Sequence, residues 1–303
     1  MIVLPGATCR HTNTSESAGP VDDMPAPHVQ ITRSEAAARL AHDLSHTHCR
    51  GCGAYHAVWP YLRLIDPPRG VDADRDRLMR VLSPLLDAGT TVLLAGSADA
   101  GLAECVLDAA AERPVDLTVL DLCETPLRQC LALLGGRAAG RLRTQQGSIT
   151  GAPVTPPVEL IVAHSVLSFL PAEDLPRAGA FMGQSLQTGG RLVMTTSIGR
   201  SAPALSTAHH RQHVLSQLSA RGVPLPGGEA EFAELLDAYT AGRAERRGPF
   251  DDLDALQRWL ADAGLAVETI EDLRRGTGFD AAGRPVPRAS KGVLVVARKG
   301  GCG

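Results

Sequence analysis

Two histidines in this sequence stand where a side chain could take a proton from a bound molecule. His164 ends the apolar run 158–164, and His56 lies in a segment that also holds aromatic residues. A neutral imidazole titrates close to neutral pH and can therefore act as a general base. Ligands of α/β sheets bind beyond the carboxyl ends of the strands, where a strand over 158–164 would place His164. We take His164, His56 and the adjacent Tyr55 as candidate catalytic residues.

Cysteine and histidine side chains also gather just before this segment. The group has one C-x-x-C pair with three histidines near it, and its members are His46, His48, Cys49, Cys52 and His56. A structural zinc site normally has a second ligand pair at a defined spacing. None follows here, so we expect no metal and interpret the two cysteines as turn and packing residues. A metal site completed by the distant histidines 209, 210 and 213 is the alternative.

Aromatic residues make up only 3% of the chain, yet Tyr55, Trp59 and Tyr61 lie close together. In a helix, positions 55, 59 and 63 share a face, so Tyr55 and Trp59 would align with Arg63. This alignment depends on how Pro60 is accommodated. Such a helix could close over a ligand as a lid, with aromatic faces around a cation or a flat molecule. The alternative is that these residues only pack the helix on the core.

Composition limits the class of protein. The chain has 303 residues with 44% hydrophobic and 21% charged residues, which suits a globular protein with a sizeable core. A net charge of −3 argues against a nucleic-acid or anionic-membrane partner. We find no apolar run near the ~20 residues of a membrane helix and no signal peptide.

The seven cysteines, an odd number, indicate buried thiols in a reduced chain. We therefore expect a cytoplasmic monomer or homodimer.

The pattern along the chain predicts three parts. Residues 1–30 are rich in Ser, Thr, Pro, Gly and Asp and read as a disordered arm. Residues 31–88 read as a helical lid. Residues 89–303 read as the core, with a polar helical insertion at about 201–248.

Within the core, apolar runs alternate with helical stretches, which predicts an α/β fold with helices on both faces of a mostly parallel sheet. The predicted strands span 90–95, 115–121, 141–147, 158–164, 191–197, 266–273 and 292–298. Because no helix separates the last two, we expect them to pair in antiparallel orientation.

Five stretches in this order resemble the class I S-adenosylmethionine-dependent methyltransferase family. They are TVLLAGSADAG, LTVLDLCETPL, QQGSIT, ELIVAHSVLSFLPAEDL and SLQTGGRLVMTT. The resemblance covers about 90–197 and 250–299, and it implies a Rossmann-like doubly wound seven-stranded sheet with an antiparallel last strand. The glycine-rich motif is degenerate, because only Gly96 and Gly101 remain and Leu94 and Ala95 stand where the family has an acidic residue.

The resemblance also implies site residues. Asp121 would bond both ribose hydroxyls of S-adenosylmethionine, Leu122 and Ile149 would contact the adenine, and Asp99 would hold the amino group. Arg63 could pair with the methionine carboxylate. The implied cofactor contacts are Gly96, Ser97, Asp99, Gly101, Asp121, Leu122, Ser148, Ile149, His164 and Arg63. The implied substrate or lid residues are Tyr55, Trp59, Tyr61 and Phe169.

The implied function is that of a methyltransferase acting on a small molecule, of the kind found in secondary metabolism. Two alternatives stay open. One is an enzyme that uses the same cofactor without methyl transfer, in an intramolecular cyclisation or a lyase reaction. The other is a non-catalytic binding protein on the same fold. Substrate identity and acceptor atom are not encoded in any of these motifs.

Overall fold

The computed structural model describes residues 30–199, 207–244, 248–273, 277–279, 284–287 and 291–301. Residues 1–29 of the predicted arm lie outside these ranges. Cys9 and Cys302 also lie outside them, as do residues 201–206 and 245–247 of the helical insertion. The five described cysteines are all free. Among the described residues, no helix is long and apolar enough to cross a membrane.

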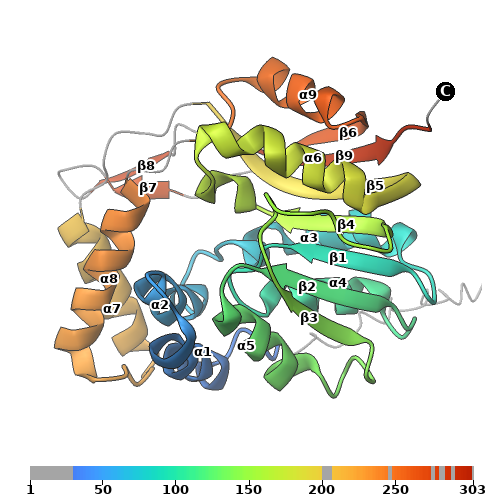
Figure 1. The fold of residues 1–303 in the computed structure, drawn as a ribbon. Coiled ribbons are helices and arrows are strands. Elements are labelled where there is room, and N and C mark those ends of the chain that lie inside the picture. The colour runs from blue at the N-terminus through green and yellow to red at the C-terminus, as the bar shows by residue number, and fades with distance from the viewer. Residues whose placement is uncertain are drawn as a thin grey trace, which may run out of the picture.

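The centre of the molecule is a seven-stranded sheet in the order β3-β2-β1-β4-β5-β9-β6 (Figure 1). Neighbouring strands from β3 to β5 run parallel, whereas β9 is antiparallel to both β5 and β6. The strands are β1 (Thr91–Ala95), β2 (Asp116–Asp121), β3 (Leu142–Gln146), β4 (Val158–His164), β5 (Leu186–Ile198), β6 (Leu265–Leu273) and β9 (Lys291–Lys299). This arrangement confirms the predicted fold class, including the antiparallel last strand.

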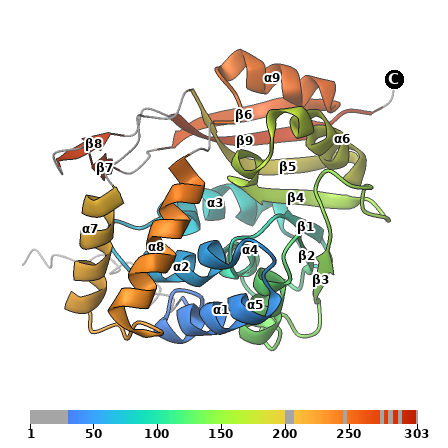
Figure 2. The same ribbon diagram turned by 60° about the vertical axis from the view of Figure 1, so that its left-hand side comes forward.

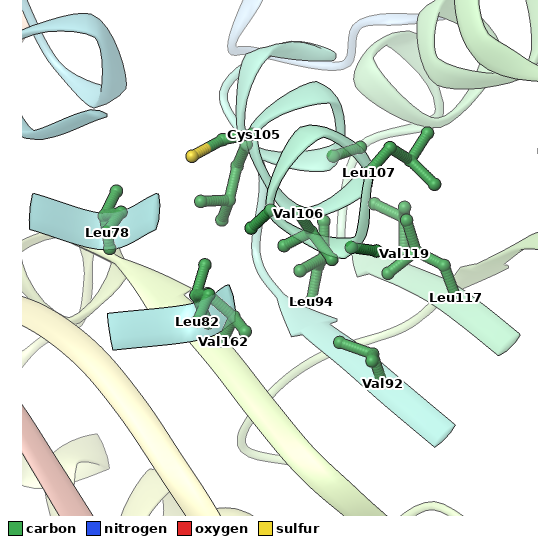
Figure 3. Packing of buried hydrophobic residues seen from close by; sticks show 14 of the residues in the cluster. Leu78, Leu82, Val92, Leu94, Cys105, Val106, Leu107, Leu117, Val119 and Val162 are labelled. Carbon is green, nitrogen blue, oxygen red and sulfur yellow. The ribbon is translucent and has the colours of Figure 1, made fainter. Parts of the chain in front are cut away.

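Helices cover both faces of the sheet because its strands are apolar on both sides. On β1, Val92 and Leu94 face one cluster of buried residues, and Leu93 and Ala95 face another. Figure 3 shows Leu78 and other helical side chains converging on the first face. The helices on that face are α3 (Val71–Leu82), α4 (Gly101–Ala110) and α5 (Glu124–Leu134), with η1 (Ser83–Leu85) after α3; those on the other are α6 (Leu175–Ser185) and α9 (Leu253–Asp262).

A separate group of helices lies beyond the carboxyl ends of the parallel strands (Figures 1 and 2). The group contains α1 (Glu35–His48), α2 (Gly53–Arg63), α7 (Thr207–Ala220) and α8 (Gly228–Ala244). Ser34 caps α1, its Oγ accepting a hydrogen bond from the Ala37 N–H at 3.2 Å. Tyr61 and Phe232, with ring centroids 5.1 Å apart, lie in the buried cluster that joins α2 to α8.

The structure departs from the predicted elements in two places. The strand β5 begins at Leu186 rather than near 191, because the chain turns directly from α6 into the sheet and pairs with β4 through a bulge. Between the two last predicted strands, where no further strand was predicted, β7 (Thr277–Phe279) and β8 (Pro285–Pro287) form an antiparallel pair. Short 3-10 turns η2 (Val166–Phe169) and η3 (Ala172–Asp174) connect β4 to α6.

Candidate functional site

A cavity of about 990 Å³ opens at the carboxyl ends of β1, β2 and β4, with α2 and α8 on its opposite side. Nine of the residues predicted to be catalytic or to bind the cofactor line it: Tyr55, His56, Gly96, Ser97, Asp121, Leu122, Ser148, Ile149 and His164. Phe169 lines it as well and is 43% exposed. The structure thus brings together residues that the sequence spreads over more than a hundred positions.

The turn after β1 exposes backbone to this cavity. Gly96 has a φ of +84°, and its N–H donates to the Leu120 carbonyl at 2.8 Å. A Cβ at this position would lie 2.4 Å from Cγ2 of Val166. Glycine is therefore required by both the left-handed conformation and the close approach of η2. The result is a tight turn that lets a ligand approach the main chain of Gly96 and Ser97.

Asp121 ties two loops together at the edge of the cavity. Its Oδ2 accepts a hydrogen bond from the Ser97 N–H at 2.8 Å, and its Oδ1 accepts one from the Cys123 N–H at 2.7 Å. Burial raises the pKa of Asp121, and the two backbone hydrogen bonds oppose that rise. The carboxylate is therefore fixed in position, with lone pairs left to accept hydrogen bonds from a ligand.

Apolar and small polar side chains flank Asp121. Leu122 is 72% exposed although it is a large hydrophobic residue, and it lies on the cavity wall. Ile149 is buried on the same wall, and the Ser148 hydroxyl lies 2.7 Å from that of Thr150. An exposed leucine beside a fixed carboxylate is a surface suited to one face of a flat ring with a polar group attached.

Arg63, Asp99 and Gly101 lie behind the turn and outside the lining. Arg63 is fully buried, and its guanidinium donates to Asp72 at 2.8 and 2.7 Å and to Asp99 at 3.1 Å. The other Asp99 oxygen accepts the Gly101 N–H at 2.7 Å. Two carboxylates thus already neutralise Arg63, and the set supports the β1–α4 turn from within the protein.

His164 is held by a carboxylate from another element. Its Nε2 lies 3.0 Å from Oδ2 of Asp74, which α3 carries and which is buried. A carboxylate at Nε2 favours the tautomer in which Nε2 carries the proton and Nδ1 can accept one. Sequence reasoning missed Asp74, because the contact spans ninety residues and arises only when α3 packs beside β4.

The outer wall of the cavity is aromatic. Tyr55 stacks on Tyr239 of α8, with centroids 5.7 Å apart and ring planes at 19°, and meets Phe169 edge to face at 5.2 Å. Trp59 stacks behind Tyr55 at 6.1 Å and packs against Gly70, outside the lining. Tyr239 was missed in the sequence. It is one of only three tyrosines in the chain and lies in the helical insertion. Its rarity and its place in that insertion could have marked it as a candidate for the cavity wall.

His56 contacts sulfur atoms instead of a carboxylate. It is buried, and its Nδ1 lies 3.2 Å from Sγ of Cys49. Burial alone lowers the pKa of His56, but hydrogen bonds with Cys123 and Cys49 raise it to about 9. Hydrogen bonds from Cys52 and His56 in turn hold the pKa of the Cys123 thiol far below its usual range. His56 and the Cys123 thiol thus form a hydrogen-bonded pair whose two pKa values shift in opposite directions.

No protein-family model and no curated protein sequence matches the chain. Among solved structures, the [4+2]-cyclase SpnF is 13% identical, with 86% of this chain and 96% of SpnF covered and a TM-score of 0.52. The N-methyltransferase NodS of Bradyrhizobium japonicum WM9, in complex with S-adenosyl-L-homocysteine, is 16% identical, with 81% and 98% covered and a TM-score of 0.47. A putative methyltransferase of Bacillus halodurans C-125 is also 16% identical, with 75% and 99% covered and a TM-score of 0.48. The strand order and the likeness to SpnF show that the chain has the Rossmann-like fold which its sequence resemblance implied.

Proposed function

We propose that this protein is an S-adenosylmethionine-dependent methyltransferase that acts on a small molecule. The observation that carries the proposal is the Asp121 carboxylate, fixed by two backbone N–H groups beside the Gly96 turn at the carboxyl end of the sheet. A carboxylate at the end of the second strand is the group that would bond the two ribose hydroxyls. The cavity of about 990 Å³ is large enough for a nucleoside and a small acceptor together.

The residues around Asp121 suit the rest of such a cofactor. Leu122 and Ile149 offer apolar contact for the adenine, and the main chain at Gly96 and Ser97 offers close approach for the methionine portion. When bound, S-adenosylmethionine supplies an electrophilic methyl group on a sulfonium. The aromatic wall formed by Tyr55 and Tyr239 is suited to contact that cation or a flat acceptor.

His164 is the base that the geometry favours. Its Nε2 is occupied by Asp74, so Nδ1 is the nitrogen that would take the acceptor's proton as the acceptor attacks. His56 is disfavoured for this role because it is buried and its Nδ1 lies 3.2 Å from the Cys49 sulfur. Tyr55 then acts on the acceptor by ring contact rather than by proton transfer.

A reaction without methyl transfer is the second candidate. SpnF, with a TM-score of 0.52, is titled a [4+2]-cyclase, so this fold also supports cyclisation. The aromatic wall formed by Tyr55, Tyr239 and Phe169 would also contact an apolar part of a substrate in such a reaction. A binding protein without catalysis on the same fold is the third.

Titration calorimetry of the full chain with S-adenosylmethionine and S-adenosylhomocysteine tests the proposal. We expect both to bind, with one site per chain. No heat of binding at millimolar ligand would exclude both enzyme candidates. Mass analysis of acceptor candidates incubated with the enzyme and the cofactor then separates the two. A product heavier by one methylene unit supports methyl transfer, whereas an isomerised acceptor with unconsumed cofactor supports cyclisation.

A further inference from the structure

Four potential metal ligands converge beside the cavity from segments far apart in the sequence. Cys49 follows the last residue of α1, Cys52 precedes the first residue of α2, and His56 lies one turn into α2. The fourth is Cys123, which precedes α5 and lies two residues after Asp121. Their ligand atoms all lie within 4.8 Å of one another.

The sulfur–sulfur distance within this cluster is that of a tetrahedral zinc site, and the sulfur–nitrogen distance is a few tenths of an ångström shorter than such a site requires. Cys49 Sγ lies 3.6 Å from Cys123 Sγ and 3.2 Å from His56 Nδ1. Zinc bonds of about 2.3 Å to sulfur and about 2.0 Å to nitrogen separate the ligand atoms of a tetrahedron by about 3.5–3.8 Å. A disulfide would bring two sulfurs to about 2.0 Å. We propose that Cys49, Cys52, His56 and Cys123 bind a zinc ion as a Cys₃His site.

The donor set and its surroundings favour zinc over harder cations. Three thiolates and one imidazole are soft and borderline ligands that select zinc among the common divalent ions. The Thr125 hydroxyl lies 3.1 Å from Cys49 Sγ and could donate to it, as outer groups do to metal-bound thiolates. Four protein ligands fill a tetrahedron, so the ion would be structural rather than catalytic.

Such an ion would join the lid to the loop that holds Asp121. Cys49 and Cys52 lie in the connection between α1 and α2, and His56 lies in the first turn of α2. Cys123 lies in the connection between β2 and α5. The Cys123 N–H is one of the two donors to Asp121. Zinc would therefore fix both the lid and the donor to Asp121. This inference stands independently of the reaction that the cavity supports.

The two cysteines before the aromatic segment were expected to be only turn and packing residues. That expectation rested on the missing second ligand pair. In the structure, the second ligand pair consists of His56, four residues after Cys52, and Cys123, which comes from a different element. A spacing rule for contiguous zinc motifs would not find such a pair. The distant histidines 209, 210 and 213 are not members of the cluster.

The metal content of the full chain, purified under reducing conditions and dialysed against a weak chelator, tests the proposal. We expect about one zinc per chain by mass spectrometry of the metal. Replacement by Co²⁺ should give the intense visible bands of tetrahedral cobalt and a thiolate charge-transfer band. A chain that retains no zinc and gives no thiolate–cobalt band would overturn the proposal.

Variants assign the ligands. Cys52→Ser and Cys123→Ser should each lose the retained zinc, and Thr125→Val, which keeps all four ligands, should weaken zinc affinity roughly 10-fold. His46→Ala is the matched control, because His42, His46 and Glu231 form a second, more exposed group that could take up surplus metal. Zinc retained in both serine variants, or lost in His46→Ala, would contradict the assignment.

A measurement on the unmodified chain covers the case in which a cysteine variant does not fold. As a thiol reagent is added in increments, the amount of zinc released should follow the modification of Cys49, Cys52 and Cys123. The buried thiols of Cys105 and Cys130 should react later. Zinc release without thiol modification would overturn the site. So would a disulfide among Cys49, Cys52 and Cys123 in the chain kept under reducing conditions.

Discussion

At the scale of single residues, Asp121 is the group on which the proposed cofactor site depends. Asp121→Ala should weaken binding of S-adenosylhomocysteine by about 1–3 kcal/mol, because hydrogen bonds to a charged acceptor are lost. Asp116→Ala is the matched control, since Asp116 begins the same strand and pairs with Arg141 away from the cavity. Calorimetry measures both. Equal affinities for the wild type and Asp121→Ala would remove Asp121 from the ribose.

The raised pKa of Asp121 adds a pH dependence to the same prediction. Burial favours the protonated carboxyl, so the charged acceptor is lost as pH falls through the raised pKa. As the pH is lowered, ligand affinity should therefore begin to decline at a higher pH than it would if Asp121 had the ordinary pKa of an aspartate. Asp121→Asn, which cannot titrate, should bind weakly and show no such decline. A wild-type affinity that stays constant down to pH values near the ordinary pKa of aspartate would contradict this.

Gly96 offers a second test at this scale, because a matched glycine exists elsewhere. Gly96 and Gly89 have nearly the same φ, +84° and +87°, but only at Gly96 would a Cβ meet Val166. Gly89→Ala should cost about 1 kcal/mol of unfolding free energy from backbone strain alone. Gly96→Ala should cost more and should also weaken ligand binding. Urea unfolding and calorimetry give the two values, and adding Val166→Ala should restore part of the loss.

At the scale of elements, the cavity is closed by contact between α2 and α8. Tyr55 and Tyr239 stack across these helices, and the buried Tyr61 and Phe232 form a second ring contact between them. Tyr239→Ala should lower the free energy of unfolding by roughly 3–5 kcal/mol, whereas Tyr239→Phe, which keeps the ring, should lower it much less. Urea denaturation compares the two. Equal losses would show that the ring does not join the helices.

The elements themselves were largely readable from the sequence. β4 matches its predicted bounds, and the other core strands of the first half differ by a residue or so at their ends. Their apolar runs and turns are local signals that packing reinforces. The β7–β8 hairpin escaped prediction because its two strands have three residues each, too few for a period to be seen.

The site was less readable, because its geometry depends on contacts between distant segments. Asp121 ends β2 and Gly96 follows β1. The fold brings the carboxyl ends of parallel strands together, so their juxtaposition could be predicted. Arg63 shows the opposite case. Its helical alignment with Tyr55 suggested a ligand contact, but Asp72 and Asp99 occupy its guanidinium inside the protein. Such pairings arise from packing that no single segment encodes.

At the scale of the whole molecule, the lid and the insertion form a buried cluster of their own, which joins the sheet domain around the cavity. Tyr55 of α2, Tyr239 of α8 and Asp121 of the sheet all line the cavity, so a ligand that fills it would contact all three elements. Any opening that separates these helices from the sheet therefore removes part of the binding site. Ligand binding should suppress that opening by mass action.

Hydrogen exchange with and without S-adenosylhomocysteine measures this coupling. At a ligand concentration about 100 times the Kd, amides of α2 and α8 that exchange by lid opening should slow about 100-fold. The helix α9 packs against α6 on a part of the sheet away from the cavity, so fraying of α9 leaves the cavity intact. The terminal amides of α9 should therefore exchange at the same rate with and without ligand. Protection confined to the turns after β1 and β2 would show that ligand binding and lid closure are independent. Equal slowing in α9 would show instead that the molecule opens as a single unit.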